Sequence, residues 1–263
     1  MNYFLAGRTL SYFLFSRHKW GHGIHSPFIF NLFSEIFENK KVEPVVKSVE
    51  IYRESLLDNN NIVRVKDLGS GSLKMGERSR RISDIARYSS TRKKYTRILS
   101  ALAISADGEP VFELGTSLGI GALTLALSAP GSKITTMEGC PETAAVAREY
   151  FRKMGINNID SRIGDIGTIL EETVSEPGSP PRLVFIDANH NEEALTGYFD
   201  VIARYAGEDT VIVIDDIHLS GSMEAGWNRI KRDDRARVTI DILQMGLIFF
   251  RSGLTKEDHV IRY

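Results

Sequence analysis

The chain has 263 residues, of which 42% are hydrophobic and 25% are charged, a composition typical of a globular protein with a sizeable core. A single cysteine, Cys140, excludes a disulfide framework and a cysteine-based metal site, and we expect a reducing, cytoplasmic setting. The apolar residues 1–16 are interrupted by Arg8 and are too few to span a bilayer. We expect a helix docked on the core or an amphipathic lid there, rather than a secretory signal.

The net charge of −1 conceals an asymmetry between two parts of the chain. Residues 1–109 contain 18 Lys and Arg against 11 Asp and Glu, whereas residues 110–263 contain 15 against 23. Most of the basic excess lies between Arg64 and Arg97. We interpret this region either as a patch for RNA or an anionic substrate, or as a solvated helix face, or as a face that packs against the acidic part.

Residues 1–109 contain helical patches, aromatic clusters and loops without regular strand alternation, which predicts a mainly helical N-terminal cover. Within this region, residues 67–72 imitate a glycine-rich cofactor loop and follow the strand-like residues 62–65. The next residues, 73–78, are polar and broken by glycine. They predict a flexible loop instead of the buried helix that a cofactor loop opens.

From residue 110 onward, strand and helix patterns alternate. Apolar runs predict buried parallel strands at 111–114, 134–137, 183–186 and 211–214, with a weaker strand at 159–162. Helices are predicted between and after them, at 120–128, 142–154, 166–174, 192–206 and 221–232. Two last strands, 237–243 and 247–251, are joined by a turn too short for a helical crossover, so they must be antiparallel. The predicted fold class is α/β: in residues 110–263, a Rossmann-like doubly wound sheet, mostly parallel, with a C-terminal antiparallel hairpin.

The most informative motif is the glycine-bearing turn after the first of these strands. Gly115 and Gly119 carry no Cβ, so the backbone of the turn can approach a nucleoside cofactor closely. The next strand ends at Glu138, where a carboxylate can accept hydrogen bonds from ribose hydroxyls. The pairing of the turn with an acid one strand away predicts a cofactor site at the carboxyl edge of the sheet.

Two later strands end in acidic residues followed by histidines. Asp187 precedes His190, and Asp215 and Asp216 precede His218. Since imidazole titrates near neutrality, His190 is the candidate general base and His218 a second candidate, with a surface histidine at a helix start as the alternative for His190. The three aspartates are candidate Mg²⁺ ligands. Alternatively, Asp187 binds a substrate hydroxyl or caps the following helix.

The chain resembles the class I S-adenosylmethionine-dependent methyltransferases in residues 113–119, Glu138, residues 164–166 and the strand ends 185–190 and 213–218, in this order. The nearest subgroup is similar to the catechol and caffeoyl-coenzyme A O-methyltransferases. Metal-dependent members have Asp followed by Asn where this chain has Asp215 and Asp216.

The resemblance implies the seven-stranded methyltransferase fold and methyl transfer from S-adenosylmethionine to a hydroxyl of a small, phenol-like or catechol-like acceptor. It assigns catalysis to His190 and Asp187 and leaves the use of Mg²⁺ open. It places the cofactor against Glu113, Gly115, Thr116, Ser117, Gly119, Glu138, Gly139, Asp165, Ile166 and Asp187.

Two other functions stay open. The basic region 64–97 is compatible with an RNA methyltransferase of the same fold. A nicotinamide-dependent oxidoreductase would share the strand, turn and acid, but the terminal antiparallel hairpin and the incomplete glycine triad argue against it. A homodimer is compatible with the fold class, and the sequence does not determine the oligomeric state.

Overall fold

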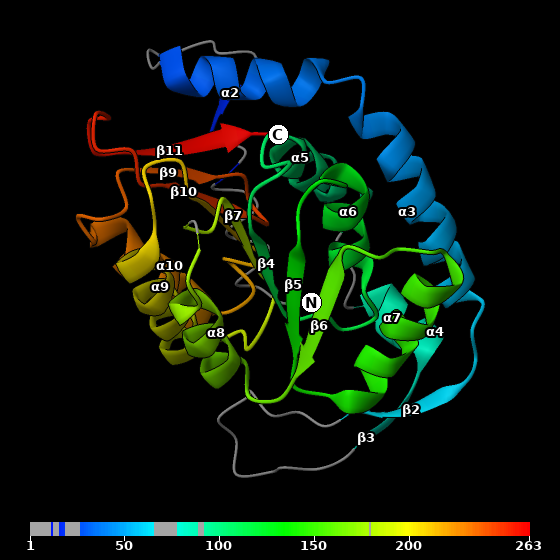
Figure 1. Cartoon of the computed structure of the whole chain (residues 1–263). Helices are drawn as coiled ribbons and strands as arrows, with labels where there is room; N and C mark the ends of the chain where they lie inside the picture. Colours follow the sequence, from blue (N-terminus) through cyan, green and yellow to red (C-terminus); the bar gives the residue numbers. More distant parts are fainter. Residues whose placement is uncertain (1–11, 13–15, 19–26, 66–77, 89–91, 179) are drawn as a thin grey trace.

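The computed structural model describes residues 12, 16–18, 27–65, 78–88, 92–178 and 180–263. A nine-stranded sheet crosses the molecule in the order β1-β11-β9-β10-β8-β7-β4-β5-β6 (Figure 1). Its strands are β1 (Arg17–His18), β4 (Val111–Leu114), β5 (Ile134–Glu138), β6 (Ile159–Ile163), β7 (Leu183–Ile186), β8 (Val211–Ile214), β9 (Val238–Asp241), β10 (Gly246–Phe249) and β11 (Glu257–Arg262).

Strand β10 runs antiparallel to both of its neighbours, β8 and β9. Every other pairing among the described strands of this sheet is parallel. The predicted mostly parallel sheet with an antiparallel hairpin is therefore confirmed. The sequence did not predict β11, which adds to β9 in parallel; three of its six residues are charged, and only His259 and Ile261 are buried.

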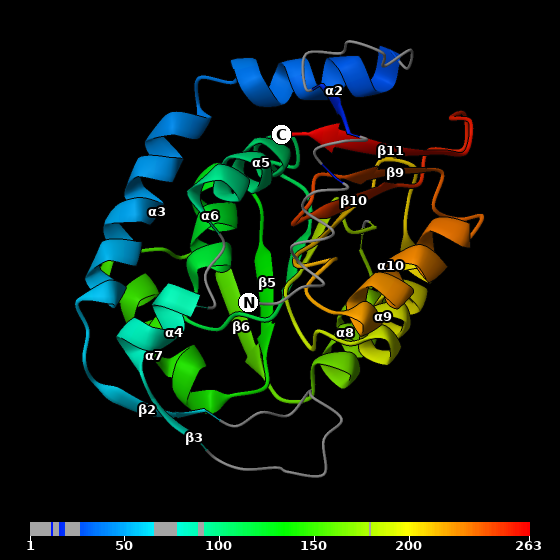
Figure 2. The same cartoon turned by 180° about the vertical axis from the view of Figure 1, so that it is seen from behind.

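Helices cover both faces of the sheet (Figures 1 and 2). On one face lie α5 (Lys93–Ile104), α6 (Ile120–Ser128) and α7 (Pro141–Lys153), and on the other α8 (Ile166–Ser175), α9 (Glu192–Tyr205) and α10 (Gly221–Arg232). Val111 joins the core cluster on the α5 and α6 side, whereas Phe112 and Leu114 join the cluster under α8 to α10. Burial on both faces explains why the strands are continuous apolar runs. Among the described helices, none is long and apolar enough to cross a bilayer.

The N-terminal part is mainly helical, with α2 (Pro27–Glu38), α3 (Val42–Leu57) and α4 (Ile82–Tyr88). Helix α3 lies along the outside of α5 and α6, where the Tyr52 hydroxyl donates to the Leu118 carbonyl at 2.6 Å. Ile29 of α2 and Val46 of α3 belong to the same core cluster as Val111 of the sheet. The cover and the sheet thus share a core, and the boundary at residue 109 stays a prediction.

An antiparallel ribbon of β2 (Ile62–Val65) and β3 (Arg78–Arg81) differs from the expected helices and loops of this part. The strand-like character of β2 was visible in its sequence, but β3 reads Arg-Ser-Arg-Arg and has no apolar alternation. Its strand conformation comes from pairing with β2. The cofactor-loop imitation at 67–72 lies outside the described residues.

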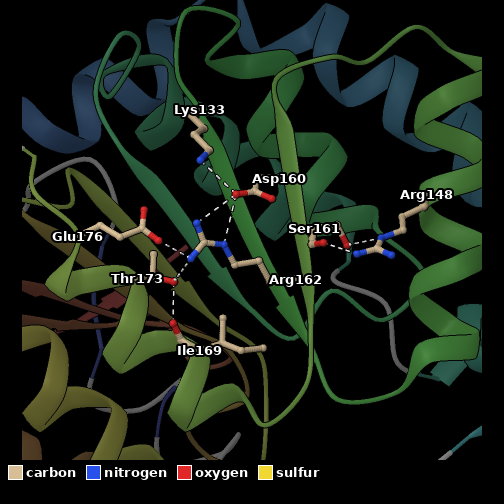
Figure 3. A network of polar contacts seen from close by, with 8 residues as sticks. All are labelled: Lys133, Arg148, Asp160, Ser161, Arg162, Ile169, Thr173 and Glu176. Carbon is tan, nitrogen blue, oxygen red and sulfur yellow. Dashed lines mark hydrogen bonds and ion pairs between the residues drawn. The ribbon is translucent and has the colours of Figure 1, made fainter.

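The edge strand β6 carries a network of charged side chains (Figure 3). Asp160 accepts from Lys133 at 3.1 Å and from Arg162 at 3.2 Å, and Arg162 also contacts Glu176 at 2.7 Å. Charged side chains on an edge strand disfavour pairing with a strand of another molecule. This edge of the sheet is therefore protected, and the charged network contributes no group to the site described next.

Candidate functional site

Strained backbone in the described residues lies at the carboxyl edge of the sheet. Four non-glycine residues in the described part of the chain have a positive φ: Ser117 (46°), Asn189 (46°), Asp216 (55°) and Leu243 (76°). Each lies two or three residues after the end of β4, β7, β8 or β9, and these four strands run in the same direction. Such backbone conformations cost about 1–3 kcal/mol each and concentrate at functional sites.

The turn after β4 brings its two glycines against other parts of the protein. Gly115 has a φ of +98°, and a Cβ there would lie 2.1 Å from the Asp187 carbonyl oxygen. Gly119 has a φ of +83°, and its Cβ would lie 2.6 Å from the Phe151 ring and 2.8 Å from Ala147. From the sequence we expected a cofactor to occupy the space left by the missing Cβ atoms of these two glycines. In the structure the loop after β7 and helix α7 occupy it.

Glu138, at the end of β5, joins the turn to the next loop. Its Oε2 accepts the Ser117 backbone N–H at 2.7 Å, and its Oε1 accepts the Cys140 backbone N–H at 2.8 Å. A carboxylate has about four lone-pair positions, so each oxygen can accept one further hydrogen bond. The structure therefore brings together the turn and the acid, the two elements of the predicted cofactor site.

Glu113 lies behind the turn and is only 1% exposed. Its carboxyl accepts hydrogen bonds from the Thr136 hydroxyl and the Ala122 backbone N–H. Burial raises the pKa of Glu113 well above its usual range, and Asp187 and Glu138 nearby act in the same direction. Thr116, also buried, contacts the same Thr136 hydroxyl. These contacts stabilise the turn from the buried side. A direct contact of Glu113 with a cofactor stays a prediction.

The loop after β6 lies next to Glu138. The Gly164 backbone N–H donates to the Glu138 carbonyl at 3.0 Å. Asp165 caps α8, since its Oδ1 accepts from the backbone N–H and the hydroxyl of Thr168 at 2.9 and 3.0 Å. Ile166 is buried in the core under α8. The cofactor contacts expected of Gly139, Asp165 and Ile166 stay predictions.

The loop after β7 pairs an aspartate with a histidine. His190 Nε2 lies 3.6 Å from Asp187 Oδ1. Burial, together with the neighbouring Asp216 and Glu138, raises the pKa of Asp187 to about 7. Burial lowers the pKa of His190, although Asp216 acts in the opposite direction. The imidazole is therefore neutral at pH 7, which is the form that can accept a proton.

Asp215 and Asp216 lie on the loop after β8. Asp215 is buried, and its Oδ1 accepts the Asp216 backbone N–H at 2.9 Å and the Gln244 side-chain amide at 3.0 Å. Burial raises the pKa of both carboxyls. Sequence reasoning missed Gln244, because a polar residue in a hairpin turn carries no recognisable signal.

The structure does not group Asp187, Asp215 and Asp216 for a metal ion. Throughout the described residues, no three His, Cys, Asp or Glu side chains are arranged to hold one. Asp215 Oδ1 is already engaged by two hydrogen-bond donors, and this side chain is directed inward. As they stand, these residues do not fit a three-carboxylate Mg²⁺ site.

His218, the second candidate base, lies in the wall of the site. Its Nε2 is 2.7 Å from Asp241 Oδ2, and its Nδ1 is buried, 3.9 Å from Glu224 Oε2. Asp241 also accepts the Leu243 backbone N–H at 2.8 Å. These contacts tie the loop after β8 to the turn after β9, which is a structural role.

Comparisons with known proteins agree with this geometry. Residues 84–249 match the profile of a family described as O-methyltransferase. A probable O-methyltransferase of Mycobacterium tuberculosis is 27% identical over 131 residues, and the alignment covers 48% of this chain and 56% of that protein. The chain thus spans about half the length of this curated relative.

Two solved structures have a similar fold. The O-methyltransferase TomG from Streptomyces achromogenes, solved in complex with SAM, has a TM-score of 0.53 at 19% identity, covering 64% of this chain and 82% of that chain. An O-methyltransferase from Bacillus cereus in complex with SAH has a TM-score of 0.54 at 15% identity, covering 79% and 91%.

We predict that Gly115→Ala destabilises the protein by at least about 2 kcal/mol, because a Cβ at a positive φ would overlap the Asp187 backbone. Urea unfolding measures the change. Gly197→Ala is the control: nothing lies within 4 Å of a Cβ at this position in α9, so it should stabilise by up to about 1 kcal/mol. A Gly115→Ala protein as stable as the unmodified chain would contradict the close approach of the two loops.

We predict that Asp187→Asn stabilises the protein at pH 8 and not at pH 4. The folded pKa of about 7 exceeds the unfolded value near 3.9, so the folded chain loses stability as pH rises from about 4 through 7. The neutral amide removes this loss, which amounts to at most about 4 kcal/mol. Urea unfolding of both proteins at the two pH values measures it. An equal difference at pH 4 and pH 8 would show that Asp187 has an ordinary pKa.

Proposed function

The chain belongs to the O-methyltransferase family, and from this premise we propose that it transfers the methyl group of S-adenosylmethionine to a hydroxyl group of a small acceptor. The observation that carries the proposal is the position of Glu138, which joins the turn after β4 to the end of β5 and keeps lone pairs available. Structures of similar fold hold SAM or SAH, which supports the choice of cofactor.

We assign the ribose of the cofactor to Glu138 and its adenine to the loop that contains Gly139, Asp165 and Ile166. When bound, S-adenosylmethionine supplies an electrophilic methyl group on a sulfonium. The family match and the antiparallel strand β10 favour methyl transfer over the hydride transfer of a nicotinamide enzyme.

His190 and Asp187 are assigned to the acceptor. Bound S-adenosylmethionine would supply its methyl group to the acceptor hydroxyl oxygen, and His190, whose lowered pKa keeps the ring neutral, would accept the proton that this oxygen releases. Asp187, 3.6 Å away, stabilises the imidazolium that forms. Alignment of the reacting atoms can supply roughly 7–11 kcal/mol of the acceleration.

The phenol-like or catechol-like character of the acceptor is a proposal from sequence resemblance. A phenolic hydroxyl loses its proton more readily than an aliphatic one, which suits a neutral imidazole as base. A requirement for Mg²⁺ also stays a prediction from the sequence, and none of the steps above depends on a metal. Unchanged activity after exhaustive EDTA treatment would exclude that requirement.

We predict that the chain binds S-adenosylmethionine and S-adenosylhomocysteine and does not bind NAD, as measured by calorimetry. Glu138→Gln should weaken the binding about 10- to 100-fold, because hydrogen bonds to a charged group contribute about 1.5–3 kcal/mol. Glu142→Gln, on the first turn of α7, is the matched control and should change the affinity less than twofold. NAD binding of equal or greater affinity would refute the proposed function.

We predict that His190→Gln lowers the single-turnover rate of methyl transfer to catechol about 10²- to 10⁴-fold, with little change in cofactor affinity. In the unmodified enzyme the rate should rise with pH as the His190 ring loses its proton, and through about pH 7 as the Asp187 carboxyl that stabilises the imidazolium ionises, and should then level off. His218→Gln should keep this profile, since its ring contacts Asp241 instead. If His218→Gln abolished the pH dependence of the rate and His190→Gln kept it, then His218 would be the general base instead of His190.

A further inference from the structure

The ribbon of β2 and β3 presents four arginines within eight paired residues. Arg64 pairs with Ser79, and Arg78, Arg80 and Arg81 pair with Val65, Val63 and Ile62. All four arginines are exposed, while Val63 anchors the ribbon in the core cluster beneath α3 and α4. Because cross-strand partners share a face, Arg78 and Arg80 lie on the same face of the ribbon as Val63, and Arg64 and Arg81 lie on the opposite face. The ribbon is therefore anchored by Val63 and carries exposed positive charge on both faces.

These arginines differ from the ion-paired arginines in the described part of the chain. Seven arginines elsewhere form ion pairs with Asp or Glu: Arg53, Arg97, Arg162, Arg182, Arg204, Arg235 and Arg251. Within the described part of the chain, the side chains of the four ribbon arginines form no ion pair. Their charge is thus available to an anionic partner.

The ribbon also lies next to the proposed cofactor site. The Arg64 backbone N–H donates to Glu142 Oε2 at 2.5 Å, and the Arg64 carbonyl lies 3.5 Å from Cys140 Sγ. The Cys140 backbone N–H in turn donates to Glu138. Figure 1 shows β2 and β3 beside α7, which begins directly after β5. A partner held by the ribbon would therefore lie beside the functional edge of the sheet.

We propose that this ribbon binds the phosphodiester backbone of a single-stranded nucleic acid. Alternate strand residues are about 6.6 Å apart, so Arg78 and Arg80 can contact successive phosphates. Guanidinium groups bind phosphate oxygens bidentately and are less hydrated than ammonium groups. Tyr88, at the end of the helix that follows β3, is 80% exposed and offers a ring on which a base can stack.

The choice of a nucleic acid over a protein partner follows from the same residues. A binding site for an acidic protein would need exposed apolar side chains as well as positive charges, because protein interfaces have an apolar core. The ribbon has one exposed large apolar residue, Ile62. The inference goes beyond the proposed function, because binding requires neither the methyl donor nor catalysis.

The test is fluorescence anisotropy with a labelled 20-nucleotide polyuridylate and the full chain, without methyl donor, between 50 and 200 mM salt. The triple variant Arg78→Gln, Arg80→Gln and Arg81→Gln should bind at least tenfold more weakly. Its plot of log affinity against log salt should be less steep by about 2, since each phosphate contact on a single strand contributes about 0.7. The matched control removes three charges from α10, at Arg229, Lys231 and Arg232, and should keep both affinity and slope.

A second variant separates stacking from charge. Tyr88→Ala should weaken binding about fivefold or more without changing the salt slope, because stacking on a base involves no counterion release. Three results would overturn the proposal: no binding to polyuridylate at 50 mM salt, equal losses in the two triple variants, or a dimer that the ribbon variant converts to a monomer. Calorimetry with S-adenosylhomocysteine on the same triple variant checks its fold and reports on the proposed function separately.

Discussion

The two backbone hydrogen bonds to the Glu138 carboxylate are the interaction on which the functional edge depends. They connect Ser117 in the turn after β4 with Cys140 in the turn after β5. Ser117 adopts a positive φ without being glycine, and its amide is held by a charged acceptor. Without this carboxylate the turn after β4 would lose the hydrogen bond that compensates its strained backbone. The turns after β4 and β5 would also no longer be held at a fixed distance from each other.

A second constraint is the crowding of carboxyl groups at the same edge. Glu113, Asp187, Asp215 and Asp216 are all buried or partly buried, and each has a raised pKa. A chain selected only for stability would replace them with apolar or amide side chains. Their retention beside strained loops is typical of a functional site, where stability is lost in favour of chemistry.

Much of the fold could be predicted from the sequence, because buried parallel strands and amphipathic helices leave strong periodic signals. The seven strands and five helices expected in the α/β part all occur, with boundaries shifted by two residues at most. Strands β3 and β11 could not be predicted, since three of four residues in β3 and three of six in β11 are charged and their conformation depends on pairing with distant partners. Local sequence does not encode such pairing.

The sequence predicted which residues gather at the candidate site better than it predicted the hydrogen bonds between them. The neighbourhood of Glu138 and the turn followed from strand order, and the approach of Asp187 to His190 followed from their spacing of three residues in one loop. The positions of Gln244 and Asp241 did not follow, because they depend on how the β9–β10 hairpin folds back on the loop after β8. The role of Gly115 also differed, since only the structure shows that the Asp187 backbone fills the space.

The most direct measurement is a crystal structure of the chain with S-adenosylhomocysteine. The account predicts that both ribose hydroxyls lie within hydrogen-bond distance of the Glu138 carboxylate, while its bonds to Ser117 and Cys140 persist, and that the sulfur faces Asp187 and His190. A nucleoside seated elsewhere, or a Glu138 carboxylate turned away from the ribose, would contradict it.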